Sequence, residues 1–131
     1  MASIPATYPW PFDGNLSRAN TALVAIDMQV DFCAPGGWVE QLGQSIENTR
    51  RPIPVIASLL DAARRAGLAI VHTREGHRAD LGDLNPNKQW RTRAHGLGIG
   101  DLGARGRILT RGEPGHAIVP ELAPREGEIV C

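Results

Sequence analysis

Two side chains capable of chemistry lie close together in the segment Thr21–Gly37. Asp27 ends the apolar run Leu23–Ile26, and Cys33 follows a few residues later. A carboxylate that accepts the proton of a thiol creates a thiolate nucleophile near neutral pH, so Asp27 is a candidate general base. Cys33 lies on the loop that leaves Asp27, not at a helix N-terminus that could lower its pKa. We therefore expect Cys33 to be a small buried hydrophobe.

The remaining polar candidates are assigned to structure. His72 and His77 flank Arg74 and Glu75, but no second acid or thiol accompanies them at a defined spacing. We expect these two histidines to make hydrogen bonds and to stabilise a loop. Cys131 is read in the same way as Cys33, as a buried apolar side chain.

The sequence around Asp27 predicts a βαβ unit, which would hold this side chain in place. Leu23–Ile26 has no polar and apolar alternation, which is typical of a strand buried on both faces of a parallel sheet. Apolar residues then recur at helical spacing from Pro52 to Ala66, and Gly67 ends the helix. A second apolar run, Leu68–Val71, completes the unit.

The order strand, helix, strand determines where the candidate base lies. Parallel strands end at the same edge of an open sheet, which is where such sheets bind ligands. We therefore expect Asp27 to lie beside the segment Thr73–Glu75.

The rest of the chain is less regular. Residues 1–20, rich in proline and aromatic side chains, are predicted to form an extended arm, and residues 21–131 one domain. Arg74–Arg107 has the length of a lid or binding segment and is predicted to contain a short helix at Pro86–Arg93. Within this helix, Trp90, Arg91 and Arg93 are assigned to a solvated face. The last predicted elements are a minor strand at Ile108–Leu109, a helical turn at Ile118–Leu122 and a third sheet strand at Glu128–Val130.

Composition excludes several classes of partner. Lys and Arg number 14 and Asp and Glu number 14, so no net field attracts nucleic acid or an anionic membrane. No apolar run approaches the roughly 20 residues of a membrane helix, and no charged and apolar leader precedes the domain. We expect a cytoplasmic homo-oligomer that binds a small molecule. No zinc-type spacing of Cys and His is present, and no cofactor is expected.

A sheet of three strands is small for this architecture. The mean sheet has about five or six strands, and the last residues of the chain are apolar strand formers. The sequence is therefore expected to be truncated after the third sheet strand.

Several motifs together resemble the isochorismatase-like cysteine hydrolase family. They are the segment from Asn20 through DMQxDF at Asp27–Phe32, the glycines Gly36 and Gly37, and the strand that ends in HTREGH at His72–His77. Within that family, the segments YPWPFDG, HTREGHRADL, NKQWR and GRILTRGEPGHAIVPEL are most similar to biuret amidohydrolases, with ureidoacrylate amidohydrolases as near relatives. The resemblance implies a three-layer α/β/α sandwich with a parallel sheet.

The resemblance also implies a mechanism that uses an Asp, a Lys and a Cys. Asp27 matches the family's Asp, and Phe32 is expected to contact substrate. The family's lysine follows the third strand and its nucleophilic cysteine comes later, so neither is in this sequence. Lys88, the only lysine, precedes the third strand and is not expected to substitute. Nicotinamidases of the family bind a metal at an Asp-x-His segment, where this chain has His72-Thr73-Arg74, so no metal is expected.

Three readings remain open at this point. In the first reading, the chain is the N-terminal part of an amidohydrolase and is inactive by itself. The intact enzyme would hydrolyse a small ureido or amide substrate, such as biuret, which yields allophanate and ammonia. Alternatively, it belongs to a ureidoacrylate, nicotinamide or isochorismate-type hydrolase of the same fold. The third reading is a truncated, non-catalytic binding or assembly module.

Overall fold

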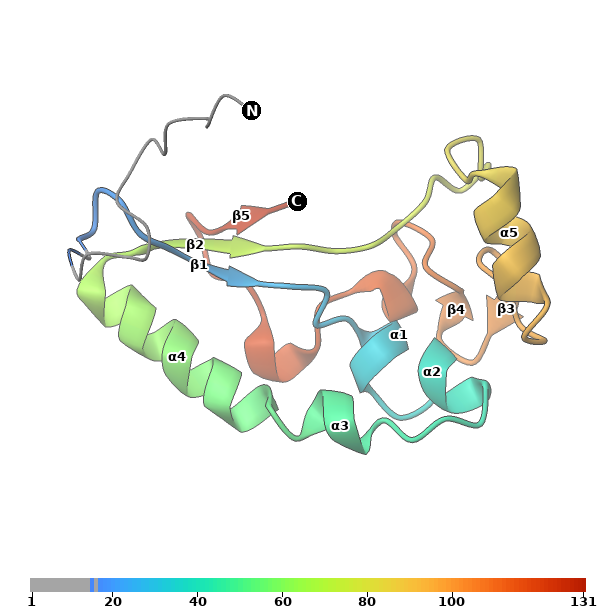
Figure 1. Cartoon of the computed structure of the whole chain (residues 1–131), viewed down its shortest axis with the longest axis horizontal. Helices are drawn as coiled ribbons and strands as arrows, with labels where there is room; N and C mark the ends of the chain where they lie inside the picture. The colour runs from blue at the N-terminus through green and yellow to red at the C-terminus, as the bar shows by residue number, and fades with distance from the viewer. Residues whose placement is uncertain (1–14, 16) are drawn as a thin grey trace, which may run out of the picture.

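The centre of the molecule is a three-stranded parallel sheet, seen in a computed structural model that describes residue 15 and residues 17–131 (Figure 1). The strands lie in the order β1-β2-β5, and their bounds are Ala22–Ala25, Ala69–His72 and Ile129–Val130. Leu23 pairs with Ile70, and Val71 pairs with Ile129. The three predicted strands and the parallel sheet are thus confirmed. Most of the predicted arm at residues 1–20 lies outside the described residues, which include residues 15 and 17–20 of it.

Helix α4, Ile53–Ala66, covers one face of this sheet (Figure 1). Pro52 precedes it, and Gly67 adopts the left-handed conformation, φ 68°, that ends it. A glycine has no Cβ and adopts this conformation without steric cost. The helix predicted from the apolar spacing is therefore confirmed at both ends.

Two apolar clusters hold the fold together. The first joins α4 to the sheet and to the segment after β1, through buried residues that include Leu60, Ile70, Cys33 and Leu122. The second is formed by buried residues of the long segment that follows β2, among them Ile99, Ile108 and Leu109. Phe32 is half-buried and packs against both clusters.

The short elements surround this core. They are α1 (Val30–Cys33), α2 (Trp38–Gln41), α3 (Glu47–Arg50), α5 (Pro86–Arg93), β3 (Leu102–Gly103), β4 (Gly106–Arg107), and the 3₁₀ helices η1 (Pro114–His116) and η2 (Pro120–Leu122).

The long segment after β2 matches the prediction in part. Helix α5 has the predicted bounds, and η2 falls within the predicted turn at Ile118–Leu122. The prediction of a minor strand at Ile108–Leu109 is wrong. The strand pairing in this part of the chain lies just before these residues, between β3 and β4. Ile108 and Leu109 are instead core residues, and Leu109 has a left-handed φ of 44°, which is incompatible with a strand.

The face of the sheet opposite α4 is apolar and open to solvent. Val24 and Ile129 are 46% and 52% exposed, and Val71 lies between them in the sheet. Among the described residues, no helix packs on this face (Figure 1). The described part of the chain thus supplies one helical layer of the expected three-layer sandwich.

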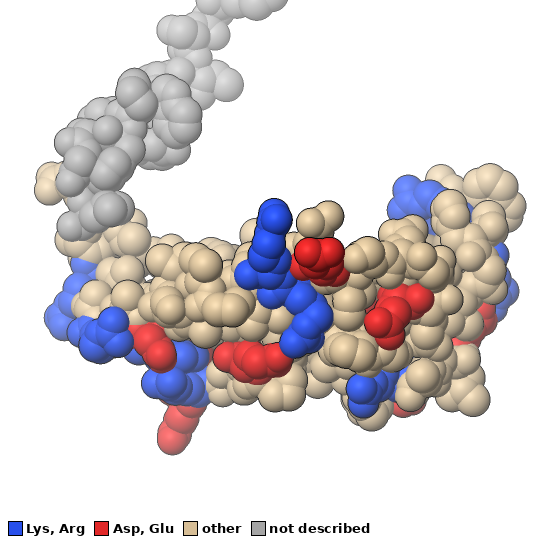
Figure 2. Space-filling model, turned by 90° about the horizontal axis from the view of Figure 1, so that it is seen from below, with Lys and Arg blue, Asp and Glu red and all other residues tan. Residues whose placement is uncertain are grey.

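The charged side chains of the surface are mixed in sign. Acidic and basic groups lie next to each other on the face seen in Figure 2. Ion pairs such as Arg50–Glu121 and Arg125–Asp61 join exposed side chains of opposite sign. No helix of the described part is both long enough and apolar enough to cross a bilayer.

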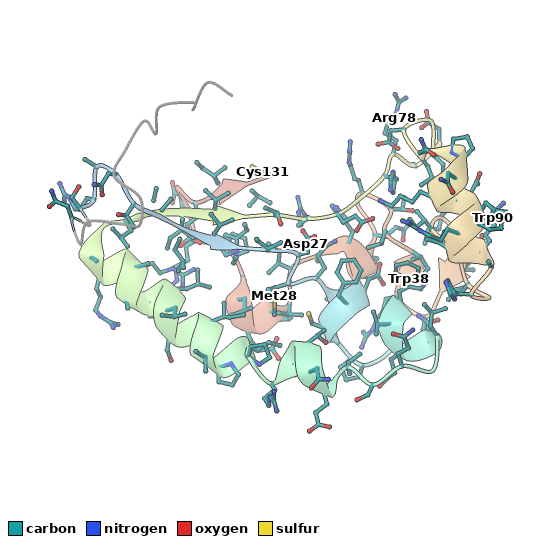
Figure 3. All side chains as sticks on the ribbon, viewed as in Figure 1. Asp27, Met28, Trp38, Arg78, Trp90 and Cys131 are labelled. Carbon is teal, nitrogen blue, oxygen red and sulfur yellow. The ribbon has the colours of Figure 1, made fainter. Side chains whose placement is uncertain are left out.

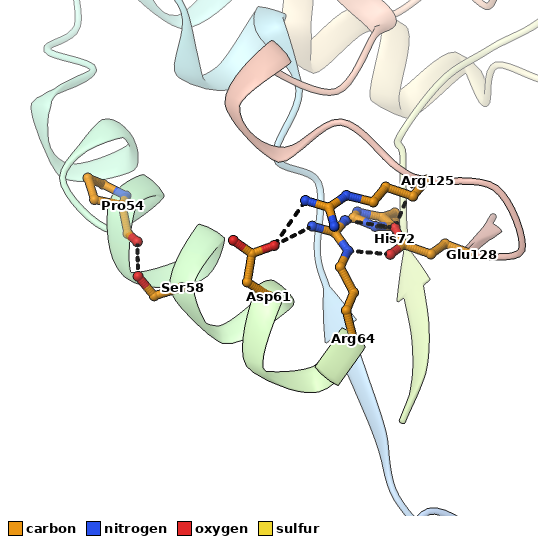
Figure 4. Close-up of polar contacts among 7 residues, drawn as sticks. All are labelled: Pro54, Ser58, Asp61, Arg64, His72, Arg125 and Glu128. Carbon is orange, nitrogen blue, oxygen red and sulfur yellow. Dashed lines mark hydrogen bonds and ion pairs between the residues drawn. The ribbon is translucent and has the colours of Figure 1, made fainter. Parts of the chain in front are cut away.

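An ion-pair cluster ties β5 to α4 and β2 (Figure 4). Arg64 of α4 donates to both carboxylate oxygens of Glu128, at 2.6 and 3.0 Å. Nε2 of the buried His72 lies 3.0 Å from Glu128 Oε2, which also accepts the backbone N–H of Arg125 at 2.9 Å. The Arg64 guanidinium in particular lowers the pKa of Glu128 to about 2. His72 therefore has the hydrogen-bonding role predicted for it.

This low pKa predicts a loss of stability in acid. A carboxylate whose pKa is lower in the folded state stabilises the fold above its unfolded value of 4.5, and this contribution is lost as the pH falls toward 2. The full shift corresponds to a loss on the order of 3 kcal/mol. We expect Glu128→Gln to be less stable than wild type at pH 6 and to show a smaller further loss between pH 4.5 and 2.5.

Denaturant unfolding across this pH range measures the effect. Glu126→Gln is the matched control, because Glu126 is exposed and lies in the same loop. An unfolding free energy with the same pH dependence in Glu128→Gln and wild type would contradict the prediction.

Candidate active site

Asp27 lies just beyond the end of β1, at the carboxyl edge of the sheet (Figure 3). It is half-buried and has a left-handed φ of 52°, a conformation that Asp and Asn adopt more readily than most residues. Its backbone N–H points to the carbonyl oxygen of Thr73, at 3.2 Å. The predicted position of Asp27 beside the residues that follow β2 is confirmed.

The side chain of Asp27 is joined to Thr73 as well. The Thr73 hydroxyl donates to Asp27 Oδ1 at 2.5 Å, and the same hydroxyl oxygen accepts the Asp27 backbone N–H at 3.1 Å. The carboxylate is therefore held by a side chain of the neighbouring strand end.

Gln29 holds together three segments around this carboxylate and was not predicted. Its side chain is fully buried, and its amide donates to the carbonyl oxygens of Glu75 and His116, at 2.9 and 3.0 Å. Its side-chain oxygen accepts the Glu75 backbone N–H at 2.7 Å. Gln29 thus fixes the segments after β1, after β2 and at η1 relative to one another. The only sequence signal for it is its place inside the DMQxDF motif.

Lys88 belongs to a neighbouring cluster of charged and polar side chains, with Glu75, His77 and Asp83. Its ammonium group forms an ion pair with Glu75 and lies 3.3 Å from His77 Nε2. Nδ1 of His77 lies 3.4 Å from an oxygen of Asp83. Lys88 therefore joins α5 to the segment after β2, and His77 has the loop-stabilising role predicted for it.

Cys33 has the properties of a core residue. It is 2% exposed, and burial raises the pKa of its thiol. Cys131 differs from its prediction, because it is exposed at the end of β5, where its backbone continues the pairing with β2. The described residues place neither thiol in a hydrogen bond with Asp27.

The other residues of the DMQxDF motif serve packing. Asp31 is 1% exposed, and burial raises the pKa of its carboxyl group, although Oδ2 accepts the Leu109 backbone N–H at 2.9 Å. The ring of Phe32 lies 6.3 Å from that of Trp38, between centroids. The substrate contact predicted for Phe32 stays a prediction.

A pocket of about 250 Å³ opens near the same edge of the sheet. Its lining residues are Arg74, Ala117, Ile118, Pro124 and Val130. Backbone hydrogen bonds join this wall to the residues directly after Asp27, since Val30 donates to Ala117 and Val119 donates to Met28. A larger hollow of about 670 Å³ lies beside Gly67, near the start of β2 and thus at the opposite edge of the sheet from Asp27. The smaller pocket is therefore the better candidate for ligand binding.

His116, at the end of η1, is a buried histidine that directly precedes the pocket-lining residue Ala117. Burial lowers its pKa, and the positive charges of Arg74 and Arg111 lower it further. The described residues contain no group of three or more His, Cys, Asp or Glu side chains arranged to hold a metal ion.

Exposed Trp90 and Arg91 agree with the solvated face predicted for α5. Trp90 is 70% exposed, and Arg91 is exposed as well. Arg93 forms an ion pair with Asp101 at 3.5 Å. None of the three takes part in the hydrogen bonds that join Asp27, Thr73, Gln29 and Glu75.

Comparisons with known proteins agree with this architecture. The isochorismatase domain matches residues 21–131. Ureidoacrylate amidohydrolase RutB of Azorhizobium caulinodans is 32% identical over 115 residues, which cover 84% of this chain and 50% of that protein. RutB of Agrobacterium fabrum is 32% identical over 126 residues, which cover 88% and 52%. The chain spans about half the length of the curated relatives it matches.

A solved structure shows the same fold. The isochorismatase family protein from Desulfovibrio vulgaris superposes with a TM-score of 0.61 at 35% sequence identity. The similarity covers 83% of this chain and 50% of that one. The residues matched by the domain include Asp27, Gln29 and Thr73.

Proposed function

Because the chain belongs to the isochorismatase family of hydrolases, we propose that it carries the general base of a cysteine-dependent amidohydrolase that acts on a small ureido or amide substrate. The observation that supports this most directly is the position of Asp27. Its carboxylate lies at the carboxyl edge of a parallel sheet, where such sheets bind ligands, and Thr73 holds one of its oxygens.

In the proposed reaction Asp27 accepts the proton of a cysteine thiol. The thiolate attacks the amide carbonyl carbon, and backbone N–H groups stabilise the oxyanion. The C–N bond breaks, the nitrogen leaves as ammonia after protonation, and water cleaves the thioester to release the acid and restore the thiol. Cys33 is not this nucleophile, because it is buried and its thiol pKa is raised.

Two substrate classes have support. The loop segments HTREGHRADL and NKQWR favour biuret, through the resemblance described above. The named relatives act on ureidoacrylate, which favours that substrate. Both molecules contain a ureido group, so we propose a ureido amide as the substrate class. The cytoplasmic location and the homo-oligomeric state stay predictions.

Ammonia release by the gene product that carries this chain tests the proposal. We expect hydrolysis of biuret or ureidoacrylate, and much slower hydrolysis of nicotinamide. The 131-residue chain alone should release no ammonia, because neither Cys33 nor Cys131 is placed to serve as the nucleophile. Hydrolysis of nicotinamide alone would favour the other branch of the family, and no hydrolysis of any amide would favour the non-catalytic reading.

A further inference from the structure

The hydrogen bonds between Asp27 and Thr73 form a closed pair. Thr73 Oγ1 donates to Asp27 Oδ1 and accepts the Asp27 backbone N–H, so the rotation of the hydroxyl is fixed by both partners. A hydroxyl has one proton, and this proton is directed at the carboxylate. Hydrogen bonds to a charged oxygen are short and strong, and the 2.5 Å distance is typical of that class.

The backbone around the pair is held equally firmly. The Thr73 N–H donates to the Ala25 carbonyl at 2.9 Å, which extends the β1–β2 pairing to the residue that carries the hydroxyl. Asp27 then turns into the left-handed conformation directly after the strand. The backbone of Thr73 is thus part of the sheet pairing, whereas Asp27 lies in a turn. The hydroxyl of Thr73 is therefore the fixed partner of the two.

One oxygen of Asp27 remains available. Among the described residues, the Thr73 hydroxyl donates to Oδ1 of Asp27, and no hydrogen bond reaches Oδ2. A carboxylate held at one oxygen can present the other in a fixed direction. A general base must lie within hydrogen-bond reach of the proton that it accepts, so this direction matters for turnover.

We propose that Thr73 is the positioning residue of Asp27, and that its hydroxyl orients the carboxylate so that Oδ2 faces the thiol. This inference rests on the proposed function. A misplacement of a catalytic group by about 1 Å costs on the order of a hundredfold in rate. The role belongs to the hydroxyl, so a residue that keeps the hydroxyl should keep the rate.

Three substitutions in the gene product that carries this chain test the assignment. We expect Thr73→Val, which has the same shape without the hydroxyl, to lower kcat for the ureido substrate by about ten- to a hundredfold. KM should change by less than about threefold, because binding contacts elsewhere remain. Thr73→Ser should keep kcat within about threefold of wild type.

Asp27→Asn distinguishes a failure of the positioning role of Thr73 from a failure of the proposed function. If Asp27→Asn abolishes turnover while Thr73→Val retains wild-type kcat, the positioning role is wrong and the proposed function stands. If Asp27→Asn turns over normally, the proposed function fails and the positioning role fails with it. A loss in Thr73→Ser as large as that in Thr73→Val would mean that keeping the hydroxyl does not keep the rate, and would overturn the inference. Thr73→Ala repeats the test if Thr73→Val does not fold.

Discussion

Asp27→Asn is expected to lower kcat of the gene product by about two to four orders of magnitude, the usual contribution of a general base. The amide of Asn keeps the shape of the carboxylate but cannot accept the thiol proton. Asn also adopts the left-handed conformation readily, so the turn at φ 52° should persist and KM should change little.

Steady-state kinetics of ammonia release, together with thermal unfolding, measure this effect. Asp80→Asn is the matched control, because Asp80 is an exposed acid in the loop after β2. Near-normal turnover in Asp27→Asn would remove Asp27 from the mechanism. A loss of turnover accompanied by an equal loss in the control would point to a general effect of charge.

The second large effect concerns the open face of the sheet. We expect the 131-residue chain alone to self-associate, because Val24, Val71 and Ile129 form an apolar row on that face. Ile26 continues the alternation of β1 on the same side and is 65% exposed. Full burial of one such side chain stabilises by about 1.5–3 kcal/mol, so leaving several of them exposed favours association.

Sedimentation velocity over a range of concentrations tests this expectation. Val24→Thr combined with Ile129→Thr should weaken self-association by on the order of tenfold or more, since about 1.4 kcal/mol corresponds to a factor of ten. The control pair is Val55→Thr with Leu59→Thr, at exposed positions of α4. A monomeric chain that unfolds cooperatively, with slow amide exchange near Ile129, would contradict the prediction.

The parts of the fold that were predictable depend on local patterns. The helix at α4 is specified by its own apolar spacing and by Gly67, and the short runs of β1 and β2 are apolar enough to be recognised as buried strands. Ile108 and Leu109 have the same apolar character, but the second cluster buries them in a turn. An apolar pair alone does not distinguish a strand from a buried loop.

The candidate site was predictable to a similar extent. The strand order of a βαβ unit is enough to bring Asp27 and Thr73 to one edge, and the structure shows them in contact. Gln29 could not be predicted, because all three partners of its side chain are backbone groups of distant segments that become neighbours only in the folded chain. The exposure of Cys131 likewise depends on which strand edge it occupies, which its sequence neighbours do not specify.

The cluster around Glu128 also has a consequence for the order of folding. Arg64 and His72 belong to the contiguous β1–α4–β2 unit, whereas Glu128 is 64 and 56 positions away from them in the sequence. The entropic cost of closing a loop rises with its length, and contacts between distant residues form slowly. Strand β5 has two residues paired with β2, followed by the backbone hydrogen bonds of Cys131, so we expect the contact between Glu128 and Arg64 to contribute to its docking. We therefore expect the β1–α4–β2 unit to form first, with Arg64 and His72 already in place to receive Glu128, and β5 to join it last.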